Sequence, residues 1–304
     1  CDPEIWLTSG EPSAPADYEV LVTGRPRLEH LTTSPNLRLL IIPYAGLPSA
    51  TRDLLQDFPG LAVHNLHHNA ALTAEMAVTL MLAAAKFILP CDRALRQNDW
   101  RPRYHPLPAL SLEGKTTLIL GFGQVGQRIG RACYALGMQI LAVRRQPDHP
   151  LQYEIPVEIY GPDMLEQLLP RSHVLIIALP ATLATEGLIG ERELALLPPG
   201  AVLVNIGRGA IVDQKALYTA LVNGQLGAAG LDVWYHYPRS QAEWEGTPPA
   251  DFPFQALDNV VLSPHRAGAS TETEALRMTH LANLLNAAAR GETVPNRVDV
   301  QAGY

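Results

Sequence analysis

Through the centre of the chain, short apolar runs rich in β-branched residues alternate with stretches whose apolar residues recur at helical spacing. The apolar runs predict strands at 116–120, 139–143, 174–179, 201–206, 228–233 and 260–263. The helical stretches predict helices at 124–136, 164–169, 191–196 and 213–222. Strands that alternate with helices over short connections are typical of a doubly wound parallel sheet covered on both faces. We therefore expect an α/β domain over residues 91–268.

The N-terminal part of the chain shows a smaller pattern of the same kind. Its apolar runs predict strands at 18–22, 37–42 and 61–64, and Ser49 begins a predicted helix over 49–58. A long helical stretch over 73–100 contains Pro90, where we expect a kink or break. Residues 101–112 show no period and are expected to form a connecting segment.

The last predicted helix, 270–290, cannot easily extend the central sheet. We expect it to return to the N-terminal domain, which would then consist of residues 1–90 and 269–304. The central domain would be inserted in this smaller domain, with a cleft between the two. Ligands are expected at the carboxyl ends of the parallel strands.

Three glycines with the spacing G-x-G-x-x-G follow the first central strand. Gly121 allows a tight turn, Gly123 lets a pyrophosphate approach the backbone, and Gly126 lets helix and strand pack closely. The start of the next helix offers unpaired N–H groups and a positive dipole end to phosphates. The predicted dinucleotide-binding residues are Gly121, Gly123, Gln124, Val125 and Gly126. The alternative is a glycine-rich turn that only joins two packed elements.

Two arginines, Arg144 and Arg145, follow the second central strand, about 20 residues beyond the glycines. An acidic residue at this place would bind the adenosine ribose hydroxyls and disfavour a 2′-phosphate. Two cations suit the 2′-phosphate instead, so we expect a preference for NADP(H), with NAD(H) possible. The alternative is a solvated basic pair after a strand.

Two further strands are each followed by a residue with candidate chemistry, one by a cation and the other by a titratable group. Arg208 lies between glycines after strand 201–206, and His265 follows Pro264 after strand 260–263. A guanidinium can hold a carboxylate or carbonyl oxygen through two hydrogen bonds. A histidine can transfer a proton near neutral pH. The pair favours chemistry on a small anion, and an ordinary turn is the alternative.

The composition narrows the class of protein. At 304 residues the chain can form two cores, and 47% apolar with 17% charged residues is typical of a globular protein. A formal net charge of −7 gives no support to a nucleic-acid partner. The longest apolar run, 72–89, is interrupted by Glu75 and Lys86, so no membrane span is expected.

The cysteines indicate a reducing compartment. They are three, odd in number and without metal-ligand spacing: Cys1, Cys91 and Cys133. No signal peptide is visible, although the chain starts at Cys1 rather than Met. We expect free thiols and a cytoplasmic location.

Taken in order along the chain, several stretches make the sequence similar to the D-isomer-specific 2-hydroxyacid dehydrogenase family, which also includes formate, phosphite and glyoxylate/hydroxypyruvate enzymes. These stretches are 121–126, 178–182, 204–209, 230–233 and 263–268. The resemblance covers nearly the whole chain. It implies a doubly wound Rossmann domain inserted in a smaller flavodoxin-like α/β substrate domain. It also implies a homodimeric NAD(P)-dependent dehydrogenase or reductase acting on CH–OH groups.

The resemblance further implies roles for individual residues. Arg208 would orient the substrate carboxylate or carbonyl, His265 would exchange a proton with the carbonyl oxygen, and Asp232 would lie near the nicotinamide carboxamide. The cofactor would also be lined by Leu179, Pro180, Thr185, Ile206, Gly207 and Gly268. The turn Tyr44-Ala45-Gly46 would hold the substrate carboxylate through backbone amides, and Asn69 would face it. Packing and turn formation are the alternatives at these positions.

One position departs from the family pattern. The family carries a glutamate, paired with the histidine, a few residues after the Leu-Asp-Val stretch, and Tyr237 holds that place here. A carboxylate partner raises a histidine pKa by about 1–3 units, so His265 should be protonated less often at neutral pH. Tyr237 could hold His265 by a neutral hydrogen bond, or Glu243 or Glu245 could supply the charge. Alternatively, the reaction needs no proton relay, as in formate oxidation.

A pair of histidines before Asn69 is also unusual, since small or apolar residues are the family's choice there. With His64, the pair His67-His68 invites a metal hypothesis. Neighbours on a strand point to opposite faces, however, and no carboxylate or cysteine completes a ligand set, so no metal is expected. We expect one histidine of the pair, His68, to face the cleft and influence substrate choice.

We therefore predict hydride transfer between NADP(H) and a small anionic substrate, a 2-ketoacid such as glyoxylate or hydroxypyruvate. The alternative is a nucleotide-binding sensor or corepressor-like protein that kept the cofactor fold and lost turnover. The missing glutamate favours this alternative, whereas the presence of Arg208 and His265 favours the enzyme.

Overall fold

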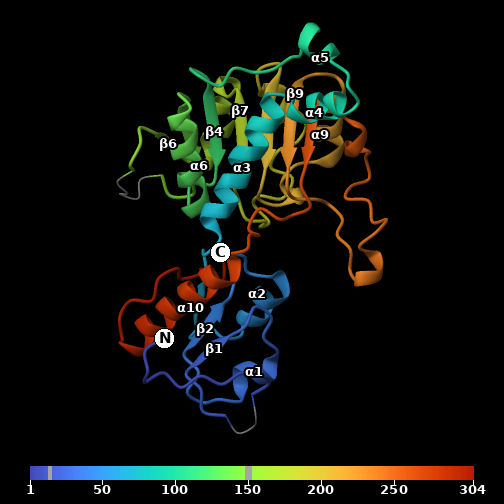
Figure 1. Cartoon of the computed structure of the whole chain (residues 1–304). Coiled ribbons are helices and arrows are strands. Elements are labelled where there is room, and N and C mark those ends of the chain that lie inside the picture. Colours follow the sequence, from blue (N-terminus) through green and yellow to red (C-terminus); the bar gives the residue numbers. More distant parts are fainter. Residues whose placement is uncertain (13–15, 148–152) are drawn as a thin grey trace. The chain divides into compact units, whose positions relative to one another are not determined.

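The computed structural model describes residues 1–12, 16–147 and 153–304, which form two compact units. The larger unit consists of Ala70–Gly268, and the smaller unit combines Cys1–Asn69 with Ala269–Tyr304. Figure 1 shows the course of the chain through each unit.

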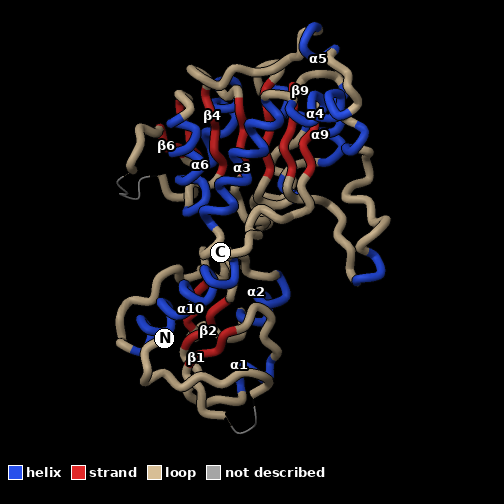
Figure 2. The backbone as a smooth tube through the Cα atoms, in the orientation of Figure 1, coloured by secondary structure: helices blue, strands red, loops and turns tan. Residues whose placement is uncertain are grey.

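A seven-stranded parallel sheet forms the centre of the larger unit, in the order β10-β9-β8-β7-β4-β5-β6. Figure 2 shows the strands of this sheet in red, with β4, β6 and β9 labelled. Its strands are β4 (Thr116–Leu120), β5 (Gln139–Val143), β6 (Glu158–Tyr160), β7 (Val174–Ile177), β8 (Ala201–Asn205), β9 (Leu226–Leu231) and β10 (Val260–Leu262). Its α-helices are α3 (Ala70–Ala85), α4 (Ile88–Arg96), α5 (Arg101–Tyr104), α6 (Gln124–Ala135), α7 (Leu165–Leu168), α8 (Glu191–Leu196) and α9 (Gln214–Val222). The predicted doubly wound parallel sheet is thereby confirmed.

Both faces of this sheet are covered. Neighbouring residues of a strand point to opposite faces, so Leu118 and Leu120 pack in the core that includes α8 and α9. Ile119 packs instead in the core that includes α3 and α6. All three side chains are buried. Strands covered on both faces consist of continuous apolar runs, which is why the sequence pattern identified them.

Helix α3 belongs to the larger unit, although we expected residues 1–90 to be part of the smaller one. It packs on α6 and on β8 and β9. A Cβ added at Gly230 of β9 would lie 2.8 Å from the Cβ of Leu80. The first boundary therefore lies at 69/70 rather than 90/91. An apolar helix pattern shows that a helix is buried but not which sheet covers it.

The helix expected over 73–100 is interrupted three residues before Pro90. Phe87 has a left-handed backbone (φ 52°) between the end of α3 and the start of α4. Pro90 lies in the first turn of α4, where no N–H is needed, and in a continuous helix its ring would clash with the carbonyl of Lys86. Among the described residues no single helix is long and apolar enough to cross a membrane, and only α3 and α4 together, bent by 67°, meet that test.

The smaller unit contains a three-stranded parallel sheet, in the order β1-β2-β3. Its elements are β1 (Val20–Val22), α1 (Leu28–Thr32), β2 (Leu39–Ile42), α2 (Ser49–Leu55), β3 (Ala62–Asn65) and α10 (Thr273–Ala289). α10 packs on one face of the sheet, where Leu284 shares a core with Leu39 and Ile41. Leu40 and Ile42 share the other core with α1 and α2.

Candidate functional site

The glycine motif forms the turn between β4 and α6. Gly121 has φ +92°, and a Cβ there would lie 2.7 Å from the carbonyl oxygen of Ala178. A Cβ at Gly126 would overlap the carbonyl oxygen of Gly121, whereas a Cβ at Gly123 would meet nothing within 4 Å. Gly121 and Gly126 are therefore required by packing. The open space at Gly123, next to Gln124 and Val125 in the first turn of α6, leaves room for a ligand.

The two arginines after β5 differ in their surroundings. The N–H of Arg144 donates to the carbonyl oxygen of Tyr160 (3.0 Å), and its Nη1 donates to the hydroxyl of Tyr153 (2.7 Å). The ring centroids of Tyr153 and Phe122 are 5.4 Å apart, and Phe122 is part of the glycine motif. The structure thus brings Arg144 to the glycine turn through Tyr153, a residue that the sequence pattern did not single out. Arg145 is exposed.

The loop after β7 is closed by its own side chains. The Thr185 hydroxyl donates to the carbonyl oxygen of Pro180 (2.7 Å) and accepts from the N–H of Thr182 (2.8 Å). A Cβ at Gly207 would lie 2.6 Å from the carbonyl oxygen of Leu179, so the loops after β7 and β8 are in direct contact. The predicted cofactor residues of these loops are therefore neighbours.

Asn205, at the end of β8, shapes the turn that carries Arg208. Its Oδ1 accepts from the N–H of Gly207 (3.0 Å), and its Nδ2 donates to the carbonyl oxygen of Arg208 (2.9 Å). Ile206 is buried beside it, while Arg208 is exposed and its Nη1 donates to the carbonyl oxygen of Gly207 (2.6 Å). The sequence analysis missed Asn205, because a single polar residue at a strand end has no periodic signal.

Asp232 joins the end of β9 to the segment that carries His265. Its carboxylate is fully buried and accepts from the Ser263 hydroxyl (2.5 Å) and from the N–H groups of Arg266 and Ala267 (both 3.0 Å). The carboxylate is thus surrounded by the loop that follows β10, which ends the larger unit at Gly268.

His265 lies at the tip of this loop. Its backbone is left-handed (φ 54°), and its N–H donates to the carbonyl oxygen of Ser263 (3.1 Å). Desolvation and the charge of Arg208 lower the pKa of His265, whereas the Asp232 carboxylate raises it. Arg208 and His265 therefore lie within electrostatic reach of each other.

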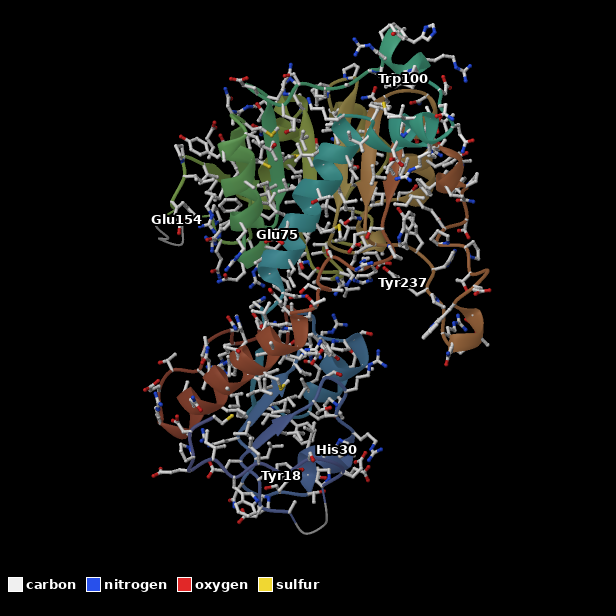
Figure 3. The ribbon with its side chains drawn as sticks, viewed as in Figure 1. Tyr18, His30, Glu75, Trp100, Glu154 and Tyr237 are labelled. Carbon is white, nitrogen blue, oxygen red and sulfur yellow. The ribbon has the colours of Figure 1, made fainter. Side chains whose placement is uncertain are left out.

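Tyr237 lies against His265. Their ring centroids are 5.4 Å apart at an interplanar angle of 55°, and Figure 3 labels Tyr237 in the larger unit. The Tyr237 hydroxyl accepts from the N–H of Trp234 (2.9 Å), and burial raises its pKa. The Trp234 indole in turn donates to the carbonyl oxygen of Ser263 (2.8 Å), so one set of contacts holds both rings.

Of the two glutamates considered as replacements, Glu243 has a partner in its own segment. Glu243 accepts from the N–H of Arg239 (2.9 Å). Among the described residues, the charges that shift the pKa of His265 are those of Arg208 and Asp232, and neither Glu243 nor Glu245 is among them.

In the smaller unit, the Tyr44-Ala45-Gly46 turn follows β2. Asn65 Nδ2 donates to the carbonyl oxygen of Ala45 (2.7 Å), which fixes the turn. The Tyr44 ring packs so closely on Gly24 that a Cβ added at Gly24 would overlap the ring. Within the described residues, the N–H groups of Ala45 and Gly46 donate to no other group of the chain. The turn therefore presents backbone donors, while the Tyr44 side chain serves packing.

The histidines before Asn69 do not form a metal site in the described part of the chain, where no group of three or more His, Cys, Asp or Glu side chains could hold an ion. His64 Nδ1 contacts the carbonyl oxygen of Pro295 (2.7 Å). His68 is buried, with 4% of its surface exposed. Asn69 is the residue at which the first segment of the smaller unit ends.

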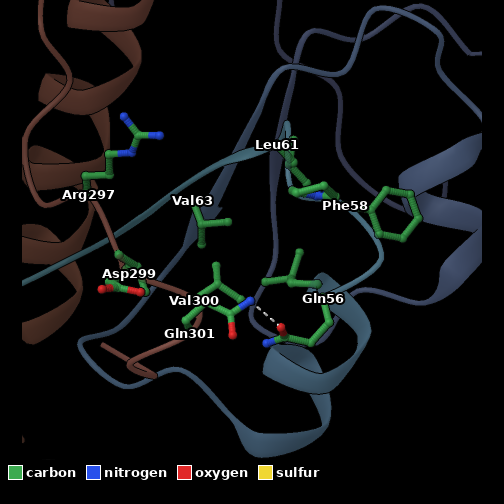
Figure 4. A pocket seen from close by; sticks show the side chains of 11 residues that line it. Gln56, Phe58, Leu61, Val63, Arg297, Asp299, Val300 and Gln301 are labelled. Atoms are coloured by element: carbon green, nitrogen blue, oxygen red, sulfur yellow. Dashed lines mark hydrogen bonds between the residues drawn. The ribbon is translucent and has the colours of Figure 1, made fainter.

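The smaller unit also contains a cavity of about 480 Å³ (Figure 4). Its walls come from the end of α2, from β3 and from the C-terminal residues 297–301, and a hydrogen bond from Gln301 to Gln56 crosses one wall. The lining includes none of the predicted site residues. The candidate chemistry therefore lies outside this cavity.

The chain is similar to known proteins of one family. The family model described as the NAD binding domain of D-isomer specific 2-hydroxyacid dehydrogenase matches residues 78–267. The glyoxylate reductase of Aeropyrum pernix is 36% identical over 322 residues, which cover 98% of this chain and 90% of that protein. The glyoxylate reductase of Korarchaeum cryptofilum is 40% identical over 232 residues, which cover 75% of this chain and 65% of that protein.

Among solved structures, a D-isomer specific 2-hydroxyacid dehydrogenase from Xanthobacter autotrophicus Py2, in complex with NADPH and MES, has a TM-score of 0.76 at 26% identity. The match covers 96% of this chain and 87% of that one. The chain belongs to the D-isomer-specific 2-hydroxyacid dehydrogenase family, whose members are NAD(P)-dependent oxidoreductases acting on CH–OH groups.

Proposed function

We propose that this chain reduces a small 2-ketoacid to the D-2-hydroxyacid with NADPH, and that glyoxylate is a substrate. The observation that carries the proposal is the grouping of Arg208, His265 and Tyr237 in the loops after β8, β9 and β10. The relatives named glyoxylate reductase support this substrate class. They also favour an enzyme over a sensor or corepressor-like protein.

The proposed chemistry follows from the two polar groups. Arg208 binds the substrate carboxylate through paired N–H···O bonds. His265 donates its proton to the carbonyl oxygen while the carbonyl carbon accepts a hydride, so that C=O becomes CH–OH. Reduced nicotinamide supplies that hydride when the cofactor is bound. In the opposite direction, His265 takes the hydroxyl proton.

Tyr237 holds the place of the missing glutamate, and we propose that it positions His265. It packs against the imidazole, and its hydroxyl is anchored by the Trp234 N–H, so it limits the orientations of His265. A phenol with a raised pKa is neutral at pH 7 and supplies no negative charge. Within the part of the chain that the structure describes, the acidic group that raises the pKa of His265 is then Asp232.

We also propose that the turn Tyr44-Ala45-Gly46 makes a second contact with the substrate carboxylate. Within the described residues the N–H groups of Ala45 and Gly46 have no partner, which supports this role, since adjacent backbone donors bind anions. Asn69 and His68 are proposed to contact the substrate from the same unit.

The preference for NADP(H) over NAD(H) is also a proposal. Arg144 is held near the glycine turn by Tyr153, which supports a role in binding a 2′-phosphate. NADPH is present in the Xanthobacter structure. The family match itself is to an NAD binding domain, so both cofactors need to be measured.

A homodimer is the proposed assembly. Helices α4 and α5 and the residues around them expose a set of large apolar side chains: Ile88, Leu89, Leu95, Trp100, Tyr104 and Leu107. Trp100 is labelled at one end of the larger unit in Figure 3. Large exposed apolar side chains are frequent in protein interfaces, and a second copy of the chain is the partner we propose for them.

The proposed activity is tested by following NADPH absorbance with glyoxylate in the wild type and in Arg208→Gln. Loss of a charge-assisted carboxylate contact should lower kcat/KM at least about 100-fold, mainly through KM. Arg239→Gln, an exposed arginine in the segment after Tyr237, serves as the control and should keep wild-type rates. NADPH binding without oxidation on any ketoacid would instead support the sensor.

A further inference from the structure

Arg144 follows directly after the residue that joins β5 to the glycine turn. The N–H of Gly121 donates to the carbonyl oxygen of Val143 (3.0 Å), and the N–H of Arg144 donates to that of Tyr160 (3.0 Å). Both hydrogen bonds lie within the larger unit. The Arg144 side chain therefore starts beside the turn that is expected to bind the pyrophosphate of a dinucleotide.

The side chain of Arg144 is anchored by a neutral group. Its Nη1 donates to the Tyr153 hydroxyl (2.7 Å), and within the described residues the guanidinium pairs with no carboxylate. The carboxylate next to Tyr153 in the chain has another partner, since Glu154 Oε2 lies 2.6 Å from Nη1 of Arg131 on α6. A carboxylate in place of the phenol would compensate the charge of Arg144, whereas a tyrosine hydroxyl leaves it available to a ligand.

Packing on the glycine motif holds the ring of Tyr153. The centroids of the Tyr153 and Phe122 rings are 5.4 Å apart at an interplanar angle of 59°. Phe122 is buried and lies over Gly130 of α6, where an added Cβ would be 3.0 Å from its ring and 3.4 Å from Ile155. Tyr153 itself is only half-buried. Its ring is thus supported from below while part of the side chain stays accessible to a ligand.

The two side chains offer different donors to one anion. A guanidinium has five N–H donors, and Arg144 uses one of them on Tyr153. The hydroxyl accepts this bond, and in the described part of the chain its own proton has no acceptor. An O–H donor beside a guanidinium matches the oxygens of a phosphate dianion. The neutral 2′-hydroxyl of NAD(H) would gain much less from the charge.

We propose that Tyr153 determines the cofactor preference: its hydroxyl fixes Arg144 and donates its own proton to the 2′-phosphate of NADP(H). The inference rests on the proposed use of NADP(H) and assigns the selectivity to a residue outside the glycine and arginine motifs. Tyr153 acts on the adenosine end of the cofactor, so it contributes to binding and not to hydride or proton transfer.

Equilibrium binding of NADPH and of NADH, followed by the fluorescence of the reduced nicotinamide, tests this role. Tyr153→Phe keeps the ring on Phe122 and removes only the hydroxyl. NADPH binding should weaken about 10- to 100-fold, as expected for the loss of a hydrogen bond to a charged group, while NADH binding stays unchanged. Tyr134→Phe, which removes an exposed hydroxyl from α6, is the matched control and should bind both cofactors like the wild type.

A second variant tests the role of the charge. In Tyr153→Glu the new carboxylate should pair with Arg144 and repel a phosphate, so NADPH binding should weaken further than in Tyr153→Phe and NADH should become the preferred cofactor. Retained NADH binding shows that each variant is folded. NADPH affinity in Tyr153→Phe equal to that of the wild type, or an equal loss of NADPH and NADH affinity, would overturn the role of Tyr153.

The inference and the proposed function fail separately. A wild type that binds NADPH and NADH equally would refute both the cofactor preference and the role of Tyr153, but oxidation of NADH by glyoxylate would still support a ketoacid reductase. A wild type that reduces no ketoacid would refute the reductase. The ratio of NADPH to NADH affinity in Tyr153→Phe would then still decide the role of Tyr153.

Discussion

His265 keeps an unfavourable backbone conformation because of a neighbouring carboxylate. A left-handed backbone is unfavourable by about 1–2 kcal/mol for a residue with a Cβ, and His265 has φ 54°. Asp232 accepts three hydrogen bonds from Ser263, Arg266 and Ala267, which hold the loop on both sides of the histidine. The position of the imidazole is therefore determined largely by Asp232.

Replacing this carboxylate should destabilise the fold. In Asp232→Asn the amide nitrogen would face an N–H donor of the loop, so the free energy of unfolding should fall by about 1–3 kcal/mol. Urea denaturation measures the change. Asp251→Asn is the control, because Asp251 also accepts hydrogen bonds but is exposed. Equal stability of the two variants would show that Asp232 does not hold the loop.

The lowered pKa of His265 predicts the pH dependence of catalysis. Ketoacid reduction needs imidazolium, so its kcat/KM should fall as the pH rises through a pKa below 6.5, and hydroxyacid oxidation should rise over the same range. Tyr237→Glu would place a carboxylate beside His265 and should raise the pH at which kcat/KM falls by about 1–3 units. Tyr237→Gln, which adds no charge, should leave this pH near its wild-type value. A fall of the wild-type kcat/KM well above pH 6.5 would contradict the prediction.

At the scale of elements, the glycines between β4 and α6 have two different roles. Two of them are required by packing, and one leaves room for a ligand. Gly121 and Gly126 are constrained by the carbonyl groups of Ala178 and Gly121, whereas space is open at Gly123. The same residue type thus serves two purposes three positions apart. The structure distinguishes them although the sequence motif does not.

This difference predicts opposite outcomes for two alanine variants. Gly126→Ala should lower the free energy of unfolding by about 1–3 kcal/mol, because the new methyl group forces α6 away from the turn. Gly123→Ala should keep wild-type stability but weaken NADPH binding about tenfold or more, since the methyl group occupies the approach of the pyrophosphate. Thermal unfolding and fluorescence titration measure the two effects. Wild-type affinity in a folded Gly123→Ala would mean that phosphate binds elsewhere.

The elements that the sequence predicted well are those with a strong local signal. β4 and β5 were predicted to the residue, because their apolar runs are buried on both faces and bounded by polar residues or glycine. β6 was missed, since it is a three-residue edge strand with an exposed glutamate. The break at Phe87 was misplaced at Pro90 because a proline disturbs the helix up to four residues before it. Asn205 and Tyr153 act through single hydrogen bonds, which leave no pattern in a sequence.

At the scale of the whole molecule, the chain passes between the two units at 69/70 and at 268/269. Candidate residues lie at both passages: His68 and Asn69 precede the first, and His265 and Gly268 precede the second. Assignment of α3 to the larger unit was not predictable, because it depends on contacts with β8 and β9 that are distant in the sequence. The proposed contacts Tyr44–Gly46, His68 and Asn69 thus belong to the smaller unit, whereas Arg208 and His265 belong to the larger one.

The proposed assembly gives a prediction at this scale. Light scattering after size-exclusion chromatography should give the mass of two chains for the wild type. Trp100→Glu combined with Leu95→Glu should give the mass of one, because charges in an apolar interface are strongly unfavourable. Leu183→Glu, which alters an exposed leucine outside the α4–α5 region, should leave the dimer intact. A monomeric wild type would refute the assembly.

The central claim is that His265 transfers the proton while the cofactor transfers the hydride. Single-turnover NADPH oxidation with glyoxylate tests it most directly in His265→Asn, because asparagine tolerates the left-handed backbone that this position requires. The account predicts that the rate falls about 100- to 10,000-fold and loses its dependence on pH below 7. A His265→Asn rate within a few-fold of the wild type, with the same pH dependence, would contradict it.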